Sequence, residues 1–155
     1  MRTVVVGIGN PVRKDDGVGL RVAREVRERT EGQGIDVVEL WAGGLRLAEA
    51  ISGYDRAVVV DAMTTRACPP GTVASVDLSS RAGLRTVSCI HDADMAVALE
   101  VWRRAGEPMP REIEIIGIET GETESLGESL TREVLAAVPE AVGLVIGAAT
   151  GKGRG

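Results

Sequence analysis

Two carboxylates and one imidazole in this sequence could together bind a divalent metal ion. Asp16 follows the first apolar run of the chain, Asp61 closes another, and His91 is the only histidine. Carboxylate and imidazole groups bind transition metals such as nickel, zinc and manganese, and three ligands leave positions open for water or substrate. Without a metal, the carboxylate of Asp16 or Asp61 could instead act as a general base.

Each of these side chains also has a simpler interpretation. Asp15 or Asp16, just before Gly17, could cap a helix. His91 taken alone would be a surface or capping residue, since spacing by itself identifies no ligand. A carboxylate after three valines, as at Asp61, is costly to desolvate unless it has a role or a partner. All three positions follow or close a predicted strand, so a parallel sheet would bring them to one edge, and on that fold we favour a common site over three unrelated roles.

Apolar runs that alternate with amphipathic segments predict such a fold. Strands are expected at residues 3–7, 35–40, 56–61, 72–77 and 112–118. Helices are expected from 18 to the glycines near 32–34, at 45–51 and from 92 to about 105. The alternation predicts a single-domain α/β fold over residues 1–150, with a mostly parallel twisted sheet of about five strands and helices on both faces. Residues 151–155 are expected to form a frayed tail.

Pro139 predicts a break in the last helical segment. The residue before a proline disfavours helical backbone, so a helix from about Thr131 should end at Val138. Pro139 is then suited to open a final helix that runs to about Ala149. A single kinked helix is the alternative.

Composition excludes several classes of protein. The 155 residues are 26% charged with a net charge of -5, and no basic stripe suits a nucleic acid. No apolar run approaches the roughly 20 residues of a membrane helix. Cys68 and Cys89 lack zinc-finger spacing and are interpreted as packed free thiols in a reducing compartment, which makes the cytoplasm the expected location. A monomer is the default expectation.

The glycines after the first strand do not make a nucleotide site. Gly7 and Gly9 begin the dinucleotide fingerprint, but Val12 stands at the third glycine position. The acidic turn that follows would also repel a pyrophosphate. A second pair, Gly43-Gly44, is either a plain turn or the flexible edge of a substrate cleft.

Several blocks of sequence carry a resemblance to one family. They are Gly7-Ile8-Gly9-Asn10-Pro11, Asp15-Asp16-Gly17-Val18-Gly19, Gly43-Gly44, Val58-Val59-Val60-Asp61-Ala62, Pro70-Gly71-Thr72, Ser88-Cys89-Ile90-His91-Asp92 and Ile116-Gly117-Ile118. In these blocks the chain resembles the hydrogenase maturation proteases, in the same order and over nearly its whole length. That resemblance implies an α/β endopeptidase with a central sheet between helices.

The resemblance also implies a substrate and a site. Members of the family remove a short C-terminal extension from the large-subunit precursor of nickel-iron hydrogenase after nickel insertion. By motif, Asp16, Asp61 and His91 would bind nickel, which the substrate would supply, or zinc or cadmium as surrogates. Asn10, Asp15, Gly43 and Gly44 belong to the same motifs and are expected to contact the substrate, with Asp16 and Asp61 as the catalytic carboxylates.

Two departures from related patterns bear on this interpretation. Many relatives carry an acidic or polar residue near Trp41-Ala42 and a threonine where Leu45 stands, which affects substrate choice. Peptidyl-tRNA hydrolases share the opening Gly-x-Gly-Asn-Pro but continue with a catalytic histidine that is missing here. A non-hydrolytic metal-binding assembly factor, or a peptidase of the same fold with an unrelated substrate, are the alternative functions.

Overall fold

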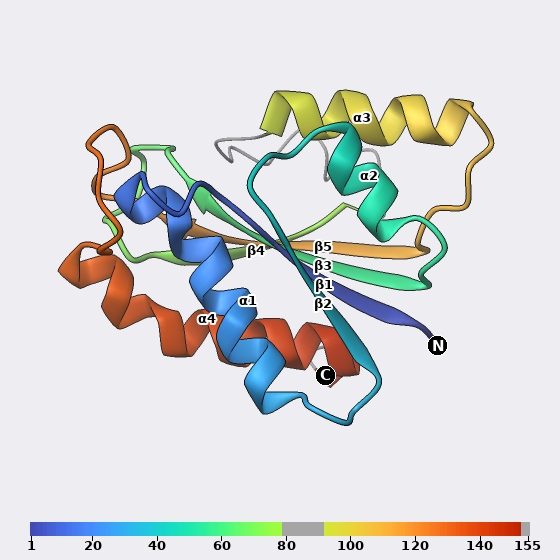
Figure 1. The fold of residues 1–155 in the computed structure, drawn as a ribbon, viewed down its shortest axis with the longest axis horizontal. Coiled ribbons are helices and arrows are strands. Elements are labelled where there is room, and N and C mark those ends of the chain that lie inside the picture. The colour runs from blue at the N-terminus through green and yellow to red at the C-terminus, as the bar shows by residue number, and fades with distance from the viewer. Residues whose placement is uncertain (79–91, 153–155) are drawn as a thin grey trace.

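A single five-stranded sheet organises the chain. The computed structural model describes residues 1–78 and 92–152. The strands are β1 (Thr3–Ile8), β2 (Ile35–Leu40), β3 (Arg56–Met63), β4 (Val73–Asp77) and β5 (Glu112–Glu119). The helices are the short 3-10 helix η1 (Lys14–Gly17), then α1 (Val18–Arg29), α2 (Leu45–Ile51), α3 (Asp92–Arg104) and α4 (Arg132–Thr150). The predicted α/β fold is confirmed (Figure 1).

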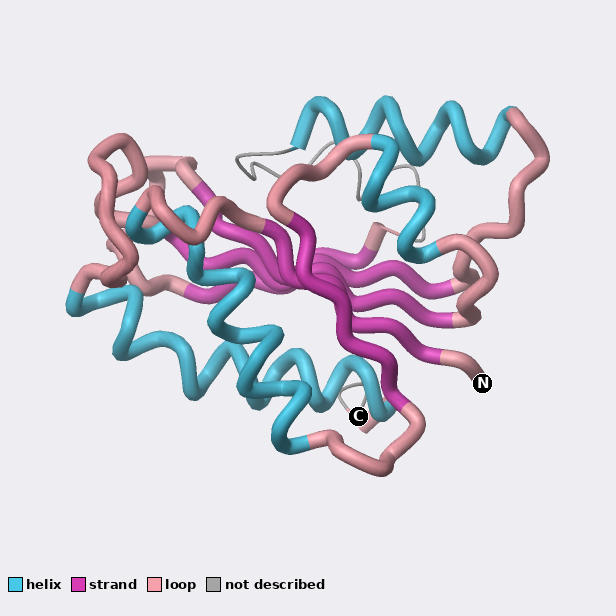
Figure 2. Tube along the Cα trace, in the orientation of Figure 1, coloured by secondary structure: helices cyan, strands magenta, loops and turns pink. Residues whose placement is uncertain are grey.

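The strand order explains where side chains can meet. It is β2-β1-β3-β5-β4, with β4 antiparallel to β5 and the other neighbours parallel. Helices α1 and α4 cover one face of the sheet and α2 and α3 the other (Figures 1 and 2). Because four strands are parallel, their carboxyl ends lie at one edge of the sheet, which we call the carboxyl edge, and their amino ends at the opposite, amino edge.

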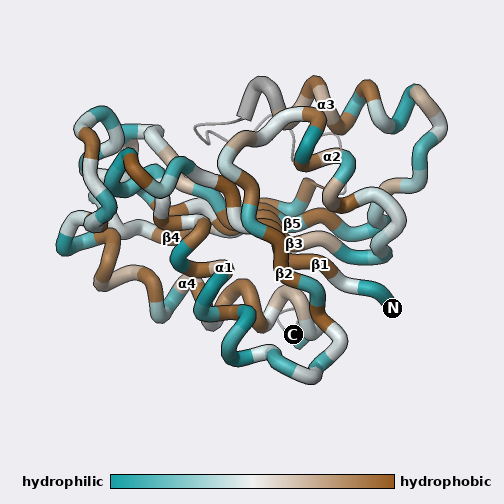
Figure 3. Tube along the Cα trace, in the orientation of Figure 1, coloured by the Kyte–Doolittle hydropathy of each residue, from teal (hydrophilic) through white to brown (hydrophobic). Residues whose placement is uncertain are grey.

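Aliphatic side chains fill the core on both faces. One cluster joins β1, β3 and β5 to α1 and α4, and the other joins the same strands to α2 and α3. The described strands are almost wholly buried in β1, β3 and β5, as expected for parallel strands between two helical layers. Figure 3 shows the resulting concentration of hydrophobic residues in the sheet and along α4.

Two local predictions were wrong. β3 continues to Met63, so Asp61 lies inside the strand instead of ending it. α4 is one helix that contains Pro139, so the predicted break at Val138 does not occur and the single-helix alternative holds. Pro139 is exposed, so water can hydrate the Leu135 carbonyl that loses its helical donor, while buried neighbours hold the helix on the sheet.

From the sequence we expected no segment long and apolar enough to span a membrane, but α4 meets both criteria. Its 19 residues are long and apolar enough by length and composition. Core helices pass the same test, and seven side chains of α4 are buried against α1 and the sheet. The apolar character of α4 is therefore explained by its place in the core.

Candidate active site

The turn after β1 lies close against the rest of the carboxyl edge. A side chain at Gly9 would collide with the Asp16 carbonyl oxygen, and one at Gly19 with the carbonyl oxygens of Ile8 and Val60. These glycines therefore let the backbone of η1 and α1 approach β1 and β3 closely. The Gly7-x-Gly9 pattern serves this close packing, and η1 is held in contact with β3.

Asp15 joins three segments of the carboxyl edge. Its carboxylate is fully buried and accepts hydrogen bonds from the backbone of Gly121, Glu122 and Thr131, at 2.7–2.9 Å, and from the Thr131 hydroxyl at 2.8 Å. These bonds fix the loop after β5 and the start of α4 next to η1. Within the described residues these bonds hold the protein together, so the structure gives Asp15 a structural role, and its contact with substrate stays a prediction.

Asp16 is buried with only half of its carboxylate satisfied. It is 4% exposed, and its Oδ2 accepts a hydrogen bond of 3.1 Å from the Asn10 backbone. Its Oδ1 is buried and has no hydrogen-bond partner among the residues that the structure describes. Burying an acceptor in this state costs about 1–3 kcal/mol, so a ligand that approaches this oxygen would recover free energy.

A hollow of about 340 Å³ opens at Asp16. We call it the Asp16 hollow; its lining residues are Arg13, Asp16, Thr64, Arg66, Thr123 and Glu124. Asn10 lies beside it through its contact with Asp16, half-buried, and its side-chain oxygen accepts a 3.1 Å hydrogen bond from the Val12 backbone. Asn10 therefore shapes the turn that carries Asp16.

Asp61 is the second predicted ligand. It lies on β3, opposite Gly117 of β5, and is fully buried. Its Oδ1 accepts a 2.8 Å hydrogen bond from the backbone of Ala62. Since η1 contacts β3, the segments that carry Asp16 and Asp61 pack together at the carboxyl edge.

The predicted third ligand, His91, lies outside the described residues. Within residues 1–78 and 92–152, no group of three His, Cys, Asp or Glu side chains is arranged to hold a metal ion. The Oδ1 of Asp16 nevertheless suits a cation, because it is a buried carboxyl oxygen to which no described residue donates a hydrogen bond.

The sequence analysis missed Glu119, the last residue of β5. It is 2% exposed, and its carboxylate accepts hydrogen bonds from the Thr65 backbone (3.3 Å), the Thr65 hydroxyl (2.9 Å) and the Arg66 backbone (2.7 Å). The signal was the one that identified Asp61, a carboxylate after an apolar strand. Glu112 and Glu114, at the start of the same strand, made the acidic residues of β5 look like an exposed face, so the buried position of Glu119 was not predicted.

A second hollow, of about 440 Å³, adjoins the first. We call it the Glu119 hollow; Thr64, Arg66, Thr123 and Glu124 line both hollows. Cys68 also lines it as an exposed free thiol, so the prediction of a packed thiol is wrong for Cys68, while Cys89 lies outside the described residues. Thr64 and Arg66, from the segment after β3, therefore lie where the two hollows meet.

The family model of the hydrogenase maturation proteases matches residues 20–148 of the chain. The chain belongs to this family. Among curated relatives of this protease, HoxM of Cupriavidus necator, a hydrogenase expression/formation protein, is 28% identical over 90% of this chain and 69% of its own. The hydrogenase 2 maturation protease of Escherichia coli is 24% identical over 90% of this chain and 92% of its own.

Solved structures give the same answer. HybD of Thermococcus kodakarensis, a [NiFe] hydrogenase maturation protease, is 29% identical, with a TM-score of 0.77 over 96% of this chain and 99% of its own. E. coli HybD, at 23% identity, shares the fold with a TM-score of 0.82 over 99% and 94% of the two chains. The protease is therefore an endopeptidase of hydrogenase maturation, and the resemblance drawn from its motifs is confirmed.

Gly44, one of the two predicted substrate glycines, lines a different hollow from Asp16. The connection from β2 to α2 starts beside the carboxyl edge, where the Leu40 carbonyl accepts a 3.0 Å hydrogen bond from the Gly9 backbone. Gly44 then lines a separate apolar hollow of about 350 Å³ with Leu45 of α2 and three residues of α3. No described hollow brings Gly44 and Asp16 together.

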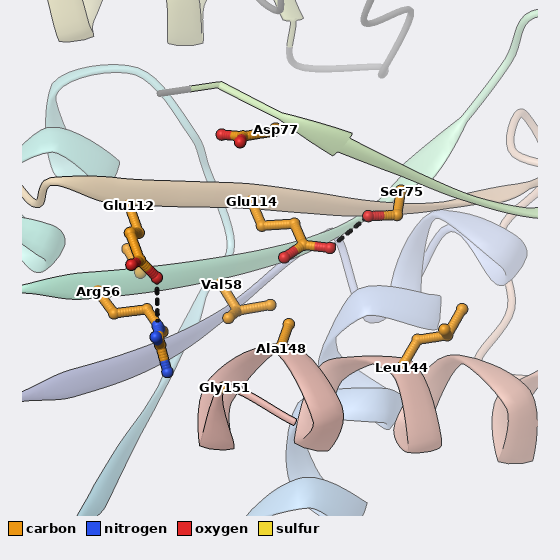
Figure 4. Close-up of a pocket in the computed structure, with 10 residues that line it drawn as sticks. Arg56, Val58, Ser75, Asp77, Glu112, Glu114, Leu144, Ala148 and Gly151 are labelled. Atoms are coloured by element: carbon orange, nitrogen blue, oxygen red, sulfur yellow. Dashed lines mark hydrogen bonds and ion pairs between the residues drawn. The ribbon is translucent and has the colours of Figure 1, made fainter. Parts of the chain in front are cut away.

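A further cavity of the protease, of about 370 Å³, lies at the amino edge between the sheet and the end of α4 (Figure 4). Four of its polar residues form two pairs: Arg56 Nε donates to Glu112 at 2.7 Å, and the Ser75 hydroxyl donates to Glu114. Arg56 also donates to the Ala149 carbonyl at 3.3 Å, tying α4 to β3. The arrangement is that of a structural contact.

Proposed function

We propose that this protease removes the C-terminal extension of a nickel-iron hydrogenase large-subunit precursor after nickel insertion, and that it recognises the nickel held by that substrate. Asp16, Asp61 and His91 would contact the metal. The names of the relatives support a hydrogenase substrate, since they include a hydrogenase 2 maturation protease and a [NiFe] hydrogenase maturation protease. The acidic chain would act as a cytoplasmic monomer.

The observation that carries the proposal is the buried Oδ1 of Asp16, which has no hydrogen-bond partner in the described part of the chain. A carboxylate oxygen in this state gains most from a cation, and nickel accepts both carboxylate and imidazole ligands. Zinc or cadmium would substitute for nickel on the same ligands. Asp61 adds a second buried carboxylate on the strand that η1 contacts.

The proposal leaves two chemical roles for these residues. Nickel bound at the site would polarise the scissile carbonyl or a water molecule. If nickel serves only as a recognition tag, the carboxylate of Asp16 or Asp61 acts as general base and takes the proton of the attacking water. In both cases Asp15 and Asn10 keep η1 in position, because Asp15 bonds the neighbouring loop and Asn10 bonds Asp16.

Mass spectrometry of the co-expressed large subunit tests this proposal, with and without the protease, in nickel-replete and nickel-starved cells. We expect loss of a C-terminal peptide only when both protease and nickel are present. Asp61→Asn should abolish processing and keep the fold, whereas Glu114→Gln at the amino edge should process normally. Processing without nickel would contradict the recognition of nickel, and normal processing by Asp61→Asn would contradict the site.

A further inference from the structure

Segment 64–66 is held in an unusual backbone conformation at the boundary of the two hollows. Arg66 has φ 56°, in the left-handed region that residues with a side chain rarely adopt. Such strain persists only when neighbouring contacts impose it, and it is frequent at functional sites. The contacts that impose it here are visible in the hydrogen bonds of Glu119.

Glu119 clamps this segment with both oxygens. Oε2 accepts from the backbone and the hydroxyl of Thr65, and Oε1 accepts from the backbone of Arg66 at 2.7 Å. The Thr65 hydroxyl in turn accepts a 3.1 Å hydrogen bond from the Ala67 backbone. Because Glu119 is 2% exposed and these bonds occupy it, its function is to position the segment.

The clamp presents Arg66 at the hollow that contains Asp16. Arg66 is exposed and lines both hollows. The other arginine of the Asp16 hollow, Arg13, already donates its Nε to the Thr123 carbonyl at 3.2 Å. A guanidinium carries five donors in a rigid fork and accepts no hydrogen bonds, so its natural partners are carbonyl and carboxylate oxygens.

We propose that Arg66 donates hydrogen bonds to main-chain carbonyl oxygens of the substrate peptide beside Asp16, and that Glu119 is the positioning residue that holds it there. This inference rests on the proposed function and names the residue that binds the peptide. The two adjoining hollows offer an extended peptide a path from Asp16 past Arg66 to Glu119. Arg66 then contributes to substrate binding, and Asp16 and Asp61 to the chemistry.

Steady-state cleavage of the purified nickel-loaded precursor tests the inference. Arg66→Ala should raise KM about tenfold and leave kcat nearly unchanged, because one charge-assisted contact made before the chemical step is lost. Arg66→Lys should recover part of the affinity. The matched control is Arg103→Ala, an exposed arginine on α3 that lines neither hollow.

Glu119→Gln separates positioning from general stability. The amide group would face a backbone N–H, so the clamp loosens, KM rises and the unfolding midpoint falls modestly. In the Arg66→Ala background, Glu119→Gln should raise KM no further, because the positioned side chain is gone. An unchanged KM in Arg66→Ala would overturn the inference, and so would an equal, additive effect of Glu119→Gln in both backgrounds.

A failure of the proposed function can be told apart from a failure of this inference about Arg66. If the wild-type protease leaves the precursor at full length, binding of the nickel-loaded precursor is measured by calorimetry instead. Weaker binding by Arg66→Ala than by wild type would then support the role of Arg66 without cleavage. Equal binding, or no binding by the wild type, would overturn it.

Discussion

The two edges of the sheet use the same acidic residue types in different ways. At the amino edge, Glu112 and Glu114 are partly exposed and contact Arg56 and Ser75. At the carboxyl edge, Asp15, Asp16 and Glu119 are at most 4% exposed, and none of them lies in an ion pair among the described residues. Within the described residues, buried carboxylates without an ion pair therefore distinguish the carboxyl edge, where the proposed site lies, from the amino edge.

The comparison also separates residues within the carboxyl edge. Asp15 and Glu119 are satisfied by backbone N–H groups and hold loops in place. Asp16 keeps one oxygen without a partner in the described structure. A fully bonded buried carboxylate stabilises the fold, whereas a half-bonded one costs stability, which is the pattern that the proposed role of Asp16 would explain.

The largest loss of stability is expected for Asp15→Ala. It removes the acceptor of four hydrogen bonds, three of them from part-buried backbone donors in the loop after β5 and just before α4. The free energy of unfolding should fall by about 3 kcal/mol, measured by urea denaturation. A loss below about 1 kcal/mol would show that Asp15 does not stabilise the fold, and the contrast between Asp15 and Asp16 would then fail.

Arg56→Met should have a smaller effect and only on stability. It removes the ion pair with Glu112 and the bond to the Ala149 carbonyl, but Glu112 is exposed enough for water to replace the guanidinium. We expect a loss of about 1 kcal/mol with unchanged cleavage of the precursor. Loss of cleavage at full stability would show that the amino edge takes part in the activity.

The smallest effect is expected at Glu122, in the loop that Asp15 holds. Hydrogen bonds from the backbone of Ser125 and Glu124 lower the pKa of its carboxyl group below the usual 4.5. The ionised group therefore stabilises the fold above its usual pKa, and this contribution is lost as the pH falls through the lowered value. Glu122→Gln should be slightly less stable than wild type near neutral pH.

Urea midpoints at two pH values check this prediction. The difference between Glu122→Gln and wild type should shrink as the pH drops below 4.5 and vanish once it has fallen below the lowered pKa, where the folded wild-type carboxyl is protonated as well. A difference that does not change with pH would mean that the charge of Glu122 makes no contribution to the loop.

The sequence predicted the fold because its strands are strong patterns. Runs such as Val58-Val59-Val60 and the alternation of strands and helices set the parallel sheet, and with it the common edge of Asp16 and Asp61. The break predicted at Pro139 was wrong because the free energy gained by burying the apolar face of α4 exceeds the local cost of a proline within the helix. The position of Glu119 after an apolar strand was a signal in the sequence, but its role was not, because its partners, Thr65 and Arg66, lie more than 50 residues away.

The site was predicted only in part for a similar reason. The motif contains both Asp15 and Asp16, but it does not tell which carboxylate has its hydrogen-bonding capacity filled by the protein. That depends on the contacts of Asp15 with Gly121 and Thr131, which are distant in the sequence. The predicted position of Asp61 at the strand end was two residues off, because strand boundaries depend on the register with β5. His91 as a ligand stays a prediction.

The most direct measurement combines precursor cleavage and thermal unfolding of Asp16→Asn. The variant keeps an oxygen for the Asn10 backbone and removes the buried charge with the unpartnered Oδ1. The account predicts that cleavage of the nickel-loaded precursor is lost while the unfolding temperature is unchanged or higher. Normal cleavage by Asp16→Asn, or loss of cleavage only through unfolding, would contradict the central claim that Asp16 is kept for function.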